Sequence, residues 1–295
     1  MTAMLTRHEF VRSHGLGNDY LVVDGDTFGI ELTEERIRKI CDRHSGVGSD
    51  GILERVKAPA GFGAAVRIYN PDGSEAEKSG NGVRIFAKFC FDHGYASDKA
   101  PLKIHTLGGP VEARLLERPS DRSVLRVSMG QVSFRCADLP MTGPDKSVVD
   151  EWVARKLKVG DRELTATCLS VGNPHAVILD APFDEEFAKK YGPQIENHAQ
   201  FPRRTNVQFV RVRDRNTVEA LIWERGAGWT QSSGSSSCAV AAACVRAGLT
   251  ERAVKVVMPG GTLEVVVGQD WSLEQVGFAQ EISRGLISSD LVAAL

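Results

Sequence analysis

The sequence has no long apolar run, and this absence excludes a helical membrane protein. No stretch of its 295 residues approaches the roughly 18 consecutive apolar residues that a membrane-spanning helix needs. The first ten residues, M-T-A-M-L-T-R-H-E-F, also lack the apolar segment of a signal peptide. We therefore expect a cytoplasmic protein that does not bind membranes.

An excess of charge of one sign is also missing. Lysine and arginine number 36 against 38 aspartates and glutamates, and the resulting net charge of −2 gives no general attraction to nucleic acid or to anionic lipid. The hydrophobic content of 42% and the charged content of 25% are those of an ordinary globular protein. We expect neither nucleic acid nor a membrane as partner.

The cysteines do not form a paired framework, which argues against a disulfide-stabilised fold. In a chain of this length, scattered cysteines are typical of reduced thiols in the cytoplasm. Two of them lie in one apolar run, where we interpret them as small buried side chains. Histidine and cysteine also show no metal-ligand spacing, so we predict no metal site. The six cysteines are Cys41, Cys90, Cys136, Cys168, Cys238 and Cys244.

What the sequence does contain is an internal repeat. S-G-N-G at 79–82 recurs as S-G-S-S at 233–236, and each turn precedes an apolar run that stops at a glycine, Gly94 or Gly248. G-N-D-Y-L-V-V matches G-N-P-H-A-V-I upstream, and L-K-I-H-T-L-G-G-P-V-E matches V-K-V-V-M-P-G-G-T-L-E downstream. The spacing between copies stays between 152 and 155 residues. It therefore indicates a duplicated domain, because solenoid repeats are far shorter.

Each copy contains the same kinds of element. Residues 66–70 and 218–224 are typical of strands, and the Gly-Gly segments predict β-hairpins. Residues 33–44 predict an amphipathic helix capped by Thr33, with 182–191 as its counterpart. The runs at 83–93 and 238–247 predict helices. The second is apolar on all sides, so we expect it to lie buried along the axis of its domain.

The expected fold class is α+β, with two pseudo-symmetric duplicated domains. Each domain is expected to be a barrel-like, mostly antiparallel sheet around a central helix. We expect one domain over 1–128 plus 278–295, where a last strand returns to the first half, and the other over 129–277. The active-site cleft is expected between them.

Two matching turns suit a reaction that needs two groups on opposite faces of one carbon. Inversion of a stereocentre is such a reaction, because one group removes a proton while the other delivers one. Glycine-lined helix N-termini could also bind a carboxylate and stabilise the charge of a developing carbanion. A P-loop is disfavoured because no Lys-Ser/Thr pair follows the turn.

The sequence resembles the diaminopimelate epimerase family over essentially its whole length. The resemblance is carried by H-G-L-G-N-D-Y (14–20), N-P-D-G-S-E-A-E-K-S-G-N-G-V-R (70–84), S-V-G-N-P-H (170–175), T-N-V-Q-F (205–209) and E-R-G-A-G-W-T-Q-S-S-G-S-S-S-C-A (224–239). It implies an isomerase that interconverts LL- and meso-diaminopimelate without pyridoxal phosphate or another cofactor, for lysine and cell-wall synthesis. By analogy alone it also implies a homodimer.

The resemblance also assigns roles to individual residues. It implies that His175 and Glu224 support the acid–base pair, and that Arg225 takes a substrate carboxylate bidentately. The set implied to hold the distal end of the substrate is Asn70, Asn173, Asn206, Glu224 and Arg225. The set implied to surround the reacting end is Asn18, Gly80, Asn81, Gly234 and Ser235.

The two reactive positions depart from the family pattern. Where the family has cysteine in C-G-N-G and C-G-S-G, this chain has Ser79 and Ser233. A thiol ionises near pH ~8.5, whereas a serine hydroxyl is far less acidic and needs an adjacent base. Trp229 and Gly51 also replace a glutamate and a glutamine of the pattern.

Four accounts fit these departures. The chain is an epimerase that works with Ser79 and Ser233 as its acid–base pair, or a related isomerase, racemase or dehydratase with another substrate. It could instead be a non-catalytic homologue that binds an amino acid, or an engineered double Cys→Ser variant. Ser232, Ser236 and Ser237 differ from the pattern too, which favours natural divergence over engineering. The intact distal-end set favours a diaminopimelate-like ligand.

Overall fold

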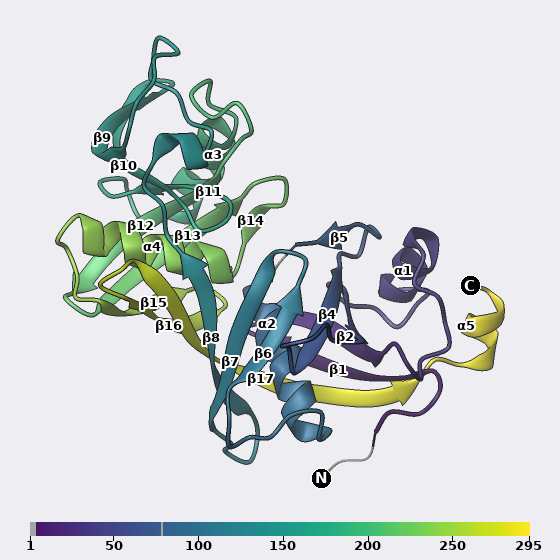
Figure 1. The fold of residues 1–295 in the computed structure, drawn as a ribbon. Helices are drawn as coiled ribbons and strands as arrows, with labels where there is room; N and C mark the ends of the chain where they lie inside the picture. The colour runs from purple at the N-terminus through teal and green to yellow at the C-terminus, as the bar shows by residue number, and fades with distance from the viewer. Residues whose placement is uncertain (1–3, 78) are drawn as a thin grey trace. The chain divides into compact units, whose positions relative to one another are not determined.

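The chain folds into two compact units. The computed structural model describes residues 4–77 and 79–295. Unit 1 consists of Met1–Val127 together with Val276–Leu295, and unit 2 consists of Ser128–Gln275. Figure 1 shows the elements of both units. Within the described ranges, no helix is long and apolar enough to cross a membrane.

Unit 1 is a strand-rich unit with one long helix, α2. The strand β17 (Ser272–Leu286) begins in unit 2 and continues into unit 1 from Val276. The other strands of unit 1 are β1 (Glu9–Gly15), β2 (Asn18–Asp24), β3 (Ile52–Val56), β4 (Ala64–Tyr69), β5 (Glu75–Ala76), β6 (Leu102–Thr106), β7 (Gly109–Glu117) and β8 (Ser123–Gln131). The last residues of β8 belong to unit 2. The helices of unit 1 are α1 (Glu34–Cys41), α2 (Gly80–Asp92) and α5 (Ser289–Ala293).

The sheet of unit 1 closes on itself. Pairing runs from β1 through β2, β3, β4, β6 and β7 to β8. Strand β8 pairs with β17, and β17 pairs with β1 from Glu9 opposite Leu286 to His14 opposite Gln280. Figure 1 shows the yellow β17 beside the purple β1. The pairs β2–β3 and β4–β6 are parallel, whereas β1–β2, β3–β4, β6–β7 and β7–β8 are antiparallel.

Unit 2 closes in the same way. Pairing runs from β10 through β11, β12, β13, β15 and β16 to β17. Just after β8, Val132 N–H donates to the Trp271 carbonyl and Ser133 bridges to Ser170 of β10, which completes the circuit. The elements of unit 2 are β9 (Trp152–Val159), β10 (Arg162–Ser170), β11 (Pro174–Ile178), β12 (Asn206–Asp214), β13 (Thr217–Glu224), β14 (Gly228–Thr230), β15 (Ala253–Met258), β16 (Gly261–Val267), α3 (Glu185–Glu196), α4 (Gly234–Arg246) and the 3₁₀ turn Cys136–Asp138.

The two units repeat one topology. In both, the second strand pairs in parallel with the third, and the fourth pairs in parallel with the strand that follows the central helix. The first pair, the third–fourth pair and the hairpin after the central helix are antiparallel in both. The α+β fold of two duplicated, barrel-like halves is therefore confirmed.

Helices α2 and α4 are the central helices of their sheets. Helix α2 contacts β1, β2, β4 and β7, and α4 contacts β10, β11, β12, β13, β15 and β16. Most residues of each helix are buried, which confirms the expectation for the second apolar run. The buried stretch Cys238–Cys244 of α4 consists of alanine, cysteine and one valine. Small side chains of this kind let surrounding strands approach the helix closely on all sides.

Both central helices begin earlier than the runs 83–93 and 238–247 indicated. Ser79 caps α2 by accepting a hydrogen bond from Gly82 N–H, and Ser233 caps α4 by accepting one from Ser236 N–H. The first turns contain glycine, asparagine and serine, which have weak helix propensity and no apolar pattern. Capping and packing therefore fix a start that periodicity does not reveal.

The two outer helices also differ from their expected bounds. Thr33 caps α1 as expected, but the helix ends at Cys41 because Asp42 accepts hydrogen bonds from the next N–H groups, those of His44 and Ser45. Helix α3 begins after its cap Asp184 and continues beyond residue 191 to Glu196. The predicted range of 182–191 therefore began and ended too early in the sequence.

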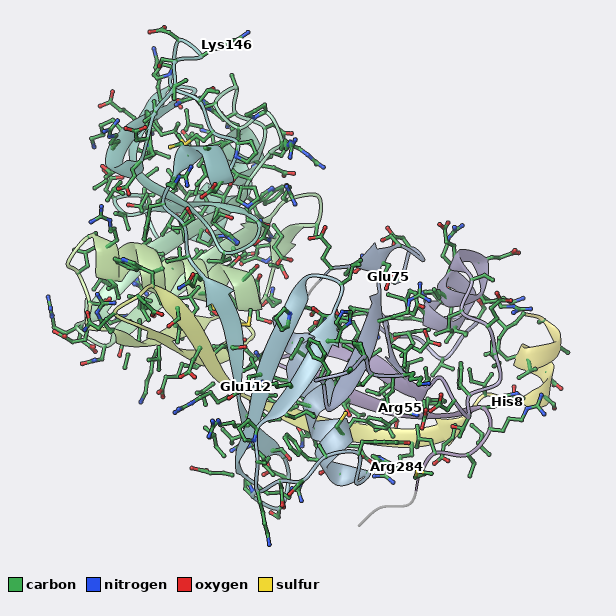
Figure 2. All side chains as sticks on the ribbon, viewed as in Figure 1. His8, Arg55, Glu75, Glu112, Lys146 and Arg284 are labelled. Carbon is green, nitrogen blue, oxygen red and sulfur yellow. The ribbon has the colours of Figure 1, made fainter. Side chains whose placement is uncertain are left out.

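A buried charge cluster joins neighbouring strands of unit 1. Arg55 on β3, labelled in Figure 2, pairs with Asp24 on β2 and lies 4.5 Å over the ring of Tyr95. The Tyr95 hydroxyl donates to the same aspartate. All six cysteines are free and buried, which confirms the interpretation of Cys238 and Cys244 as small buried side chains.

Candidate active site

The first half-site is formed around Ser79, the N-cap of α2. Its Oγ accepts a hydrogen bond from Gly82 N–H at 3.1 Å, so the helix start fixes the position of this oxygen. The Tyr20 hydroxyl on β2 lies 3.3 Å from the same Oγ. Gly80 is the first residue of the helix, and its missing side chain leaves the N-terminal N–H groups open to close approach.

A network of charges holds Asn18 beside the same turn. Asn18 Nδ2 donates to Asp50 at 3.0 Å, and Asn81 Nδ2 on α2 lies 3.5 Å from Asn18 Oδ1. Arg43 binds both Asp50 and Asp19 at 2.7 Å. Burial opposes ionisation of Asp19, but hydrogen bonds from Arg43 and Arg12 outweigh it and hold the pKa of Asp19 below its usual value. Asn18 and Asn81 are thus held together with Ser79 in unit 1.

The second half-site is formed around Ser233, the N-cap of α4. Ser233 is buried, and its Oγ accepts from Ser236 N–H at 3.4 Å. Glu224 lies at the end of β13, and burial raises the pKa of its carboxyl group. A hydrogen bond from the Ser233 hydroxyl acts in the opposite direction on this pKa, because it stabilises the carboxylate. The carboxyl group of Glu224 therefore interacts with one of the two capping serines.

His175 lies fully buried on β11 and is neutral. Burial lowers the pKa of His175 to about 3, and the charge of Arg225 adds to the shift. Nδ1 accepts from Gln208 Nε2 at 3.0 Å, so Nε2 carries the proton and donates to Asn173 Oδ1 at 2.9 Å. The Gln208 amide also donates to Ser236 Oγ in the first turn of α4. His175 is thus connected to the start of α4 through Gln208 and has no hydrogen bond with Ser233.

The residues implied to hold the distal end of the substrate differ in how many hydrogen bonds they already make within the protein. Asn206 Nδ2 donates to the Pro174 carbonyl and Asn206 Oδ1 accepts from Arg225 N–H, so this amide ties the Arg225 turn to β11. Asn173 is engaged by His175, and Asn70 Nδ2 donates to Ser74 Oγ at 3.0 Å. Arg225 is exposed, and its side chain donates to the Arg203 carbonyl at 3.3 Å. Its guanidinium forms no ion pair with the described residues.

The remaining turn residues support the start of α4. The Gly234 carbonyl accepts from the Gln275 amide at 2.9 Å and from Ser237 Oγ at 2.8 Å. Ser236 and Ser237, two of the serines that depart from the family pattern, are fully buried and make these internal hydrogen bonds. Ser235 in the same turn stays partly exposed.

The other two departures have local structural explanations. Trp229 on β14 lies opposite Trp223, packs against the core of unit 2, and has the Lys189 ammonium of α3 at 5.4 Å from its ring centre. Gly51 has a φ of +151°. A Cβ there would lie 2.2 Å from the Tyr69 carbonyl oxygen and 2.8 Å from the Tyr20 ring, so no larger residue fits without movement.

Sequence reasoning did not find three polar groups of these half-sites. Tyr20, Gln208 and Gln275 contact the capping serines or the first turn of α4. Tyr20 and Gln208 both stand inside quoted motifs, and Gln208 is a polar residue in the otherwise apolar run of β12. An uncompensated polar side chain in a buried strand was the available signal.

Solved structures of known proteins share this two-barrel fold. A hydroxyproline epimerase from Agrobacterium vitis matches 97% of this chain and 92% of its own with a TM-score of 0.67 and 13% identity. A phenazine biosynthesis protein from Bacillus anthracis matches 96% of this chain and 100% of its own, also with a TM-score of 0.67, at 15% identity. At this identity the likeness establishes the fold alone.

Sequence comparison identifies the family. The family model for diaminopimelate epimerase matches residues 10–135 and 167–280. "Diaminopimelate epimerase 2" of Nostoc sp. is 41% identical over 97% of both chains, and a diaminopimelate epimerase of Desulforudis audaxviator is 41% identical over 86% of this chain and 90% of its own. The chain belongs to the diaminopimelate epimerase family, and its relatives are isomerases of the epimerase type.

Proposed function

We propose that this protein inverts an amino-acid α-carbon by two-base proton transfer without a cofactor, and that it interconverts LL- and meso-diaminopimelate in lysine biosynthesis. One observation carries the proposal: each copy of the repeat places a serine at the N-cap of its buried central helix, Ser79 on α2 and Ser233 on α4. A serine needs an adjacent base to act in proton transfer, and the effect of the Ser233 hydroxyl on the pKa of Glu224 supports this carboxyl group as that base. Membership of the family supports the reaction class and the substrate.

In this proposal each copy of the repeat supplies one acid–base group, and both groups serve one substrate. Ser233 takes the α-proton while its own proton passes to Glu224, and Ser79 delivers a proton to the other face of the carbon. The N-terminal N–H groups of α2 and α4 stabilise the carboxylate as charge develops. His175, being neutral, positions the start of α4 through Gln208 and does not act as a base in its resting state.

The proposed ligand contacts follow the residue roles that the family resemblance implies. Arg225 offers a guanidinium without an ion-pair partner among the described residues, which suits the distal carboxylate of the substrate. Asn206 positions the backbone of Arg225, and Asn70 and Asn173 are proposed to contact the distal amino-acid group. Asn18, Asn81 and Ser235 are proposed to surround the reacting end.

Proton exchange in deuterium oxide tests this function. The purified protein is incubated with LL- and with meso-diaminopimelate, and loss of the α-proton and change of configuration are followed by NMR and chiral chromatography. We expect both stereoisomers to acquire deuterium with inversion. Tight binding without exchange would favour a non-catalytic amino-acid-binding homologue. Exchange or elimination with another substrate alone would favour a divergent racemase, isomerase or dehydratase.

The double variant Ser79→Cys with Ser233→Cys tests the same pocket in another way. If the pocket retains the family's substrate geometry, two thiols should raise the epimerisation rate, because a thiol is the stronger acid. The matched control is Ser288→Cys, which alters the N-cap of α5 and neither half-site. No gain in the double variant would indicate that the pocket serves a different ligand.

A further inference from the structure

Tyr20 lies against the reactive oxygen of the first half-site and has no role in the function proposed above. Its hydroxyl is 3.3 Å from Ser79 Oγ, and the residue is only 6% exposed. Because Gly82 N–H already donates to Ser79 Oγ, this oxygen cannot turn away without breaking the cap of α2. A phenol is therefore held within hydrogen-bonding distance of Ser79.

Gly51 makes room for the Tyr20 ring. Leu21 on β2 pairs with Ile52 on β3, so Tyr20 stands beside Gly51 at the start of the ladder. A Cβ at Gly51 would lie 2.8 Å from Tyr20 Cε1 and 3.1 Å from Cδ1. A substitution at Gly51 would therefore displace the ring that reaches Ser79.

The duplicate positions in unit 2 show that this arrangement is specific to unit 1. His175 and Asn206, which pair across β11 and β12, occupy the places of Tyr20 and Gly51 in the repeat. There the Asn206 side chain fills the space and binds the Pro174 carbonyl and Arg225 N–H. The serine of unit 2 instead has Glu224 as its ionisable partner, at the repeat position of Asn70.

We propose that Tyr20 is the proton partner of Ser79, so that the two serines are served by unlike groups, a phenol in unit 1 and a carboxylate in unit 2. This inference rests on the proposed epimerase function. Tyr20 does not touch the substrate in this scheme. It is a positioning residue that acts through Ser79.

The proton balance of one turnover follows from this pairing. The α-proton passes to Ser233 Oγ as the Ser233 proton passes to Glu224, which becomes neutral. The carbanion takes the proton of Ser79, and Ser79 takes the phenolic proton of Tyr20, which becomes phenolate. Inversion in the opposite direction starts with Tyr20 as phenolate and Glu224 neutral. Water returns the protein to the starting state when it protonates the Tyr20 phenolate and accepts the proton of Glu224. A phenol ionises near pH ~10, so it carries the negative charge better than a serine alkoxide would.

The variant Tyr20→Phe keeps the ring and removes only the hydroxyl. We expect inversion to slow by about 100-fold, the low end of what one acid–base group contributes. The stereoisomer whose α-proton faces Ser233 should still exchange deuterium, now with retention of configuration, because Glu224 and Ser233 are intact. The matched control is Tyr95→Phe, which removes a phenol hydrogen bond beyond the opposite end of α2 and should leave the ratio of exchange to inversion unchanged. An unchanged ratio in Tyr20→Phe as well would overturn the proposal.

A spectroscopic measurement tests the pairing without relying on turnover. With ¹³C at the ζ carbon of tyrosine, the four tyrosines give four signals, and the Tyr20 signal is the one missing from Tyr20→Phe. We expect Ser79→Ala to move that signal and its titration while Tyr69, Tyr95 and Tyr191 stay in place. A Tyr20 signal that ignores Ser79→Ala would refute the pairing. If the wild type exchanges no α-proton while the signal does move, the proposed function fails and the pairing stands.

Discussion

At the scale of single residues, burial acts on two ionisable side chains of unit 2 and favours the neutral form of both. It lowers the pKa of His175 to about 3 and raises the pKa of Glu224. Their hydrogen-bond partners then separate their roles. Both nitrogens of His175 are engaged by neutral amides, whereas the Glu224 carboxyl group receives a serine hydroxyl. The histidine is thereby held as a structural link, and the proposed function assigns the role of base to the Glu224 carboxylate.

The variant Glu224→Gln should lose activity and gain stability at neutral pH. Loss of a general base costs on the order of 10²- to 10⁴-fold in rate. Because the native pKa of Glu224 lies above its unfolded value, the folded protein binds this proton more tightly, and the free energy of unfolding falls as pH rises through that window. Glutamine has no proton to lose, so the variant should be more stable than the wild type above the window.

Denaturant unfolding in acid and at neutral pH, together with the deuterium exchange assay, measures both effects. The control Glu219→Gln changes a carboxylate on the same strand that is paired with Arg211 and Arg213, and it should instead lose stability at neutral pH. Equal stability changes for Glu224→Gln in acid and at neutral pH would contradict the assignment of a raised pKa.

Among single residues, the sequence allowed the capping serines and Glu224 to be located, but not Tyr20. Ser79 and Ser233 are recognisable because a repeat and a family motif both point to them. Tyr20 reaches Ser79 only because Gly51 lacks a side chain on a neighbouring strand. Such a contact depends on the register of β2 and β3, which no local pattern in the sequence specifies.

At the scale of elements, the two central helices are delimited by matching residues. Each begins at a serine whose Oγ accepts from the N–H three residues later. Each is followed by a glycine in the left-handed region, Gly94 at φ 77° and Gly248 at φ 71°. The ends could be predicted from these glycines, whereas the starts could not, because the first turns carry no apolar pattern.

Each serine thus combines a capping role with a proposed chemical role, and paired substitutions separate the two. Ser79→Ala and Ser233→Ala should each lower the free energy of unfolding by about 1 kcal/mol, and the glycine variants by only a few tenths. Activity should be lost equally in the alanine and glycine variants, because both lack the hydroxyl. Denaturant unfolding and the exchange assay measure the two effects.

Ser288→Ala is the matched control, since Ser288 caps α5 through Leu291 N–H at 3.2 Å. It should reduce stability and leave activity unchanged. Activity that follows stability across all these variants, instead of following the presence of the hydroxyl, would show that the serines act only as caps.

At the scale of the whole molecule, both barrels depend on strands β8 and β17. Residues 123–127 and 276–286 of these strands belong to unit 1, and residues 128–131 and 272–275 belong to unit 2. The barrel of unit 1 is therefore complete only when its first strand, β1, pairs with the last part of β17. The return of the chain end to the first half was predictable from the apolar pattern near residue 278. The length of β17 was not, because its alternation continues across the boundary.

A chain that ends at Gln275 should therefore lose the fold of unit 1 and keep that of unit 2. Removing the strand that pairs with Glu9–His14 leaves the backbone groups of β1 without their partner on that side. Hydrogen–deuterium exchange read by mass spectrometry should show fast exchange in β1, β2 and α2 but slow exchange in α4. The control chain ends at Ser288 and lacks only α5 and the residues after it; no residue of α5 is buried. Slow exchange in unit 1 of the shorter chain would contradict this dependence.

The shared strand β17 has a consequence for how the ribosome delivers this protein. Domains usually fold in the order in which they emerge, N-terminal first. Here the N-terminal half emerges first, and the edge of β1 that pairs with β17 stays open while the whole second half is translated. Such an edge invites pairing with other nascent chains. The last strand segment of the second half is translated before the segment of β17 that closes the first half. The half that is synthesised first is therefore the last to complete its barrel. The time for which its sheet edge stays open depends on the speed of translation.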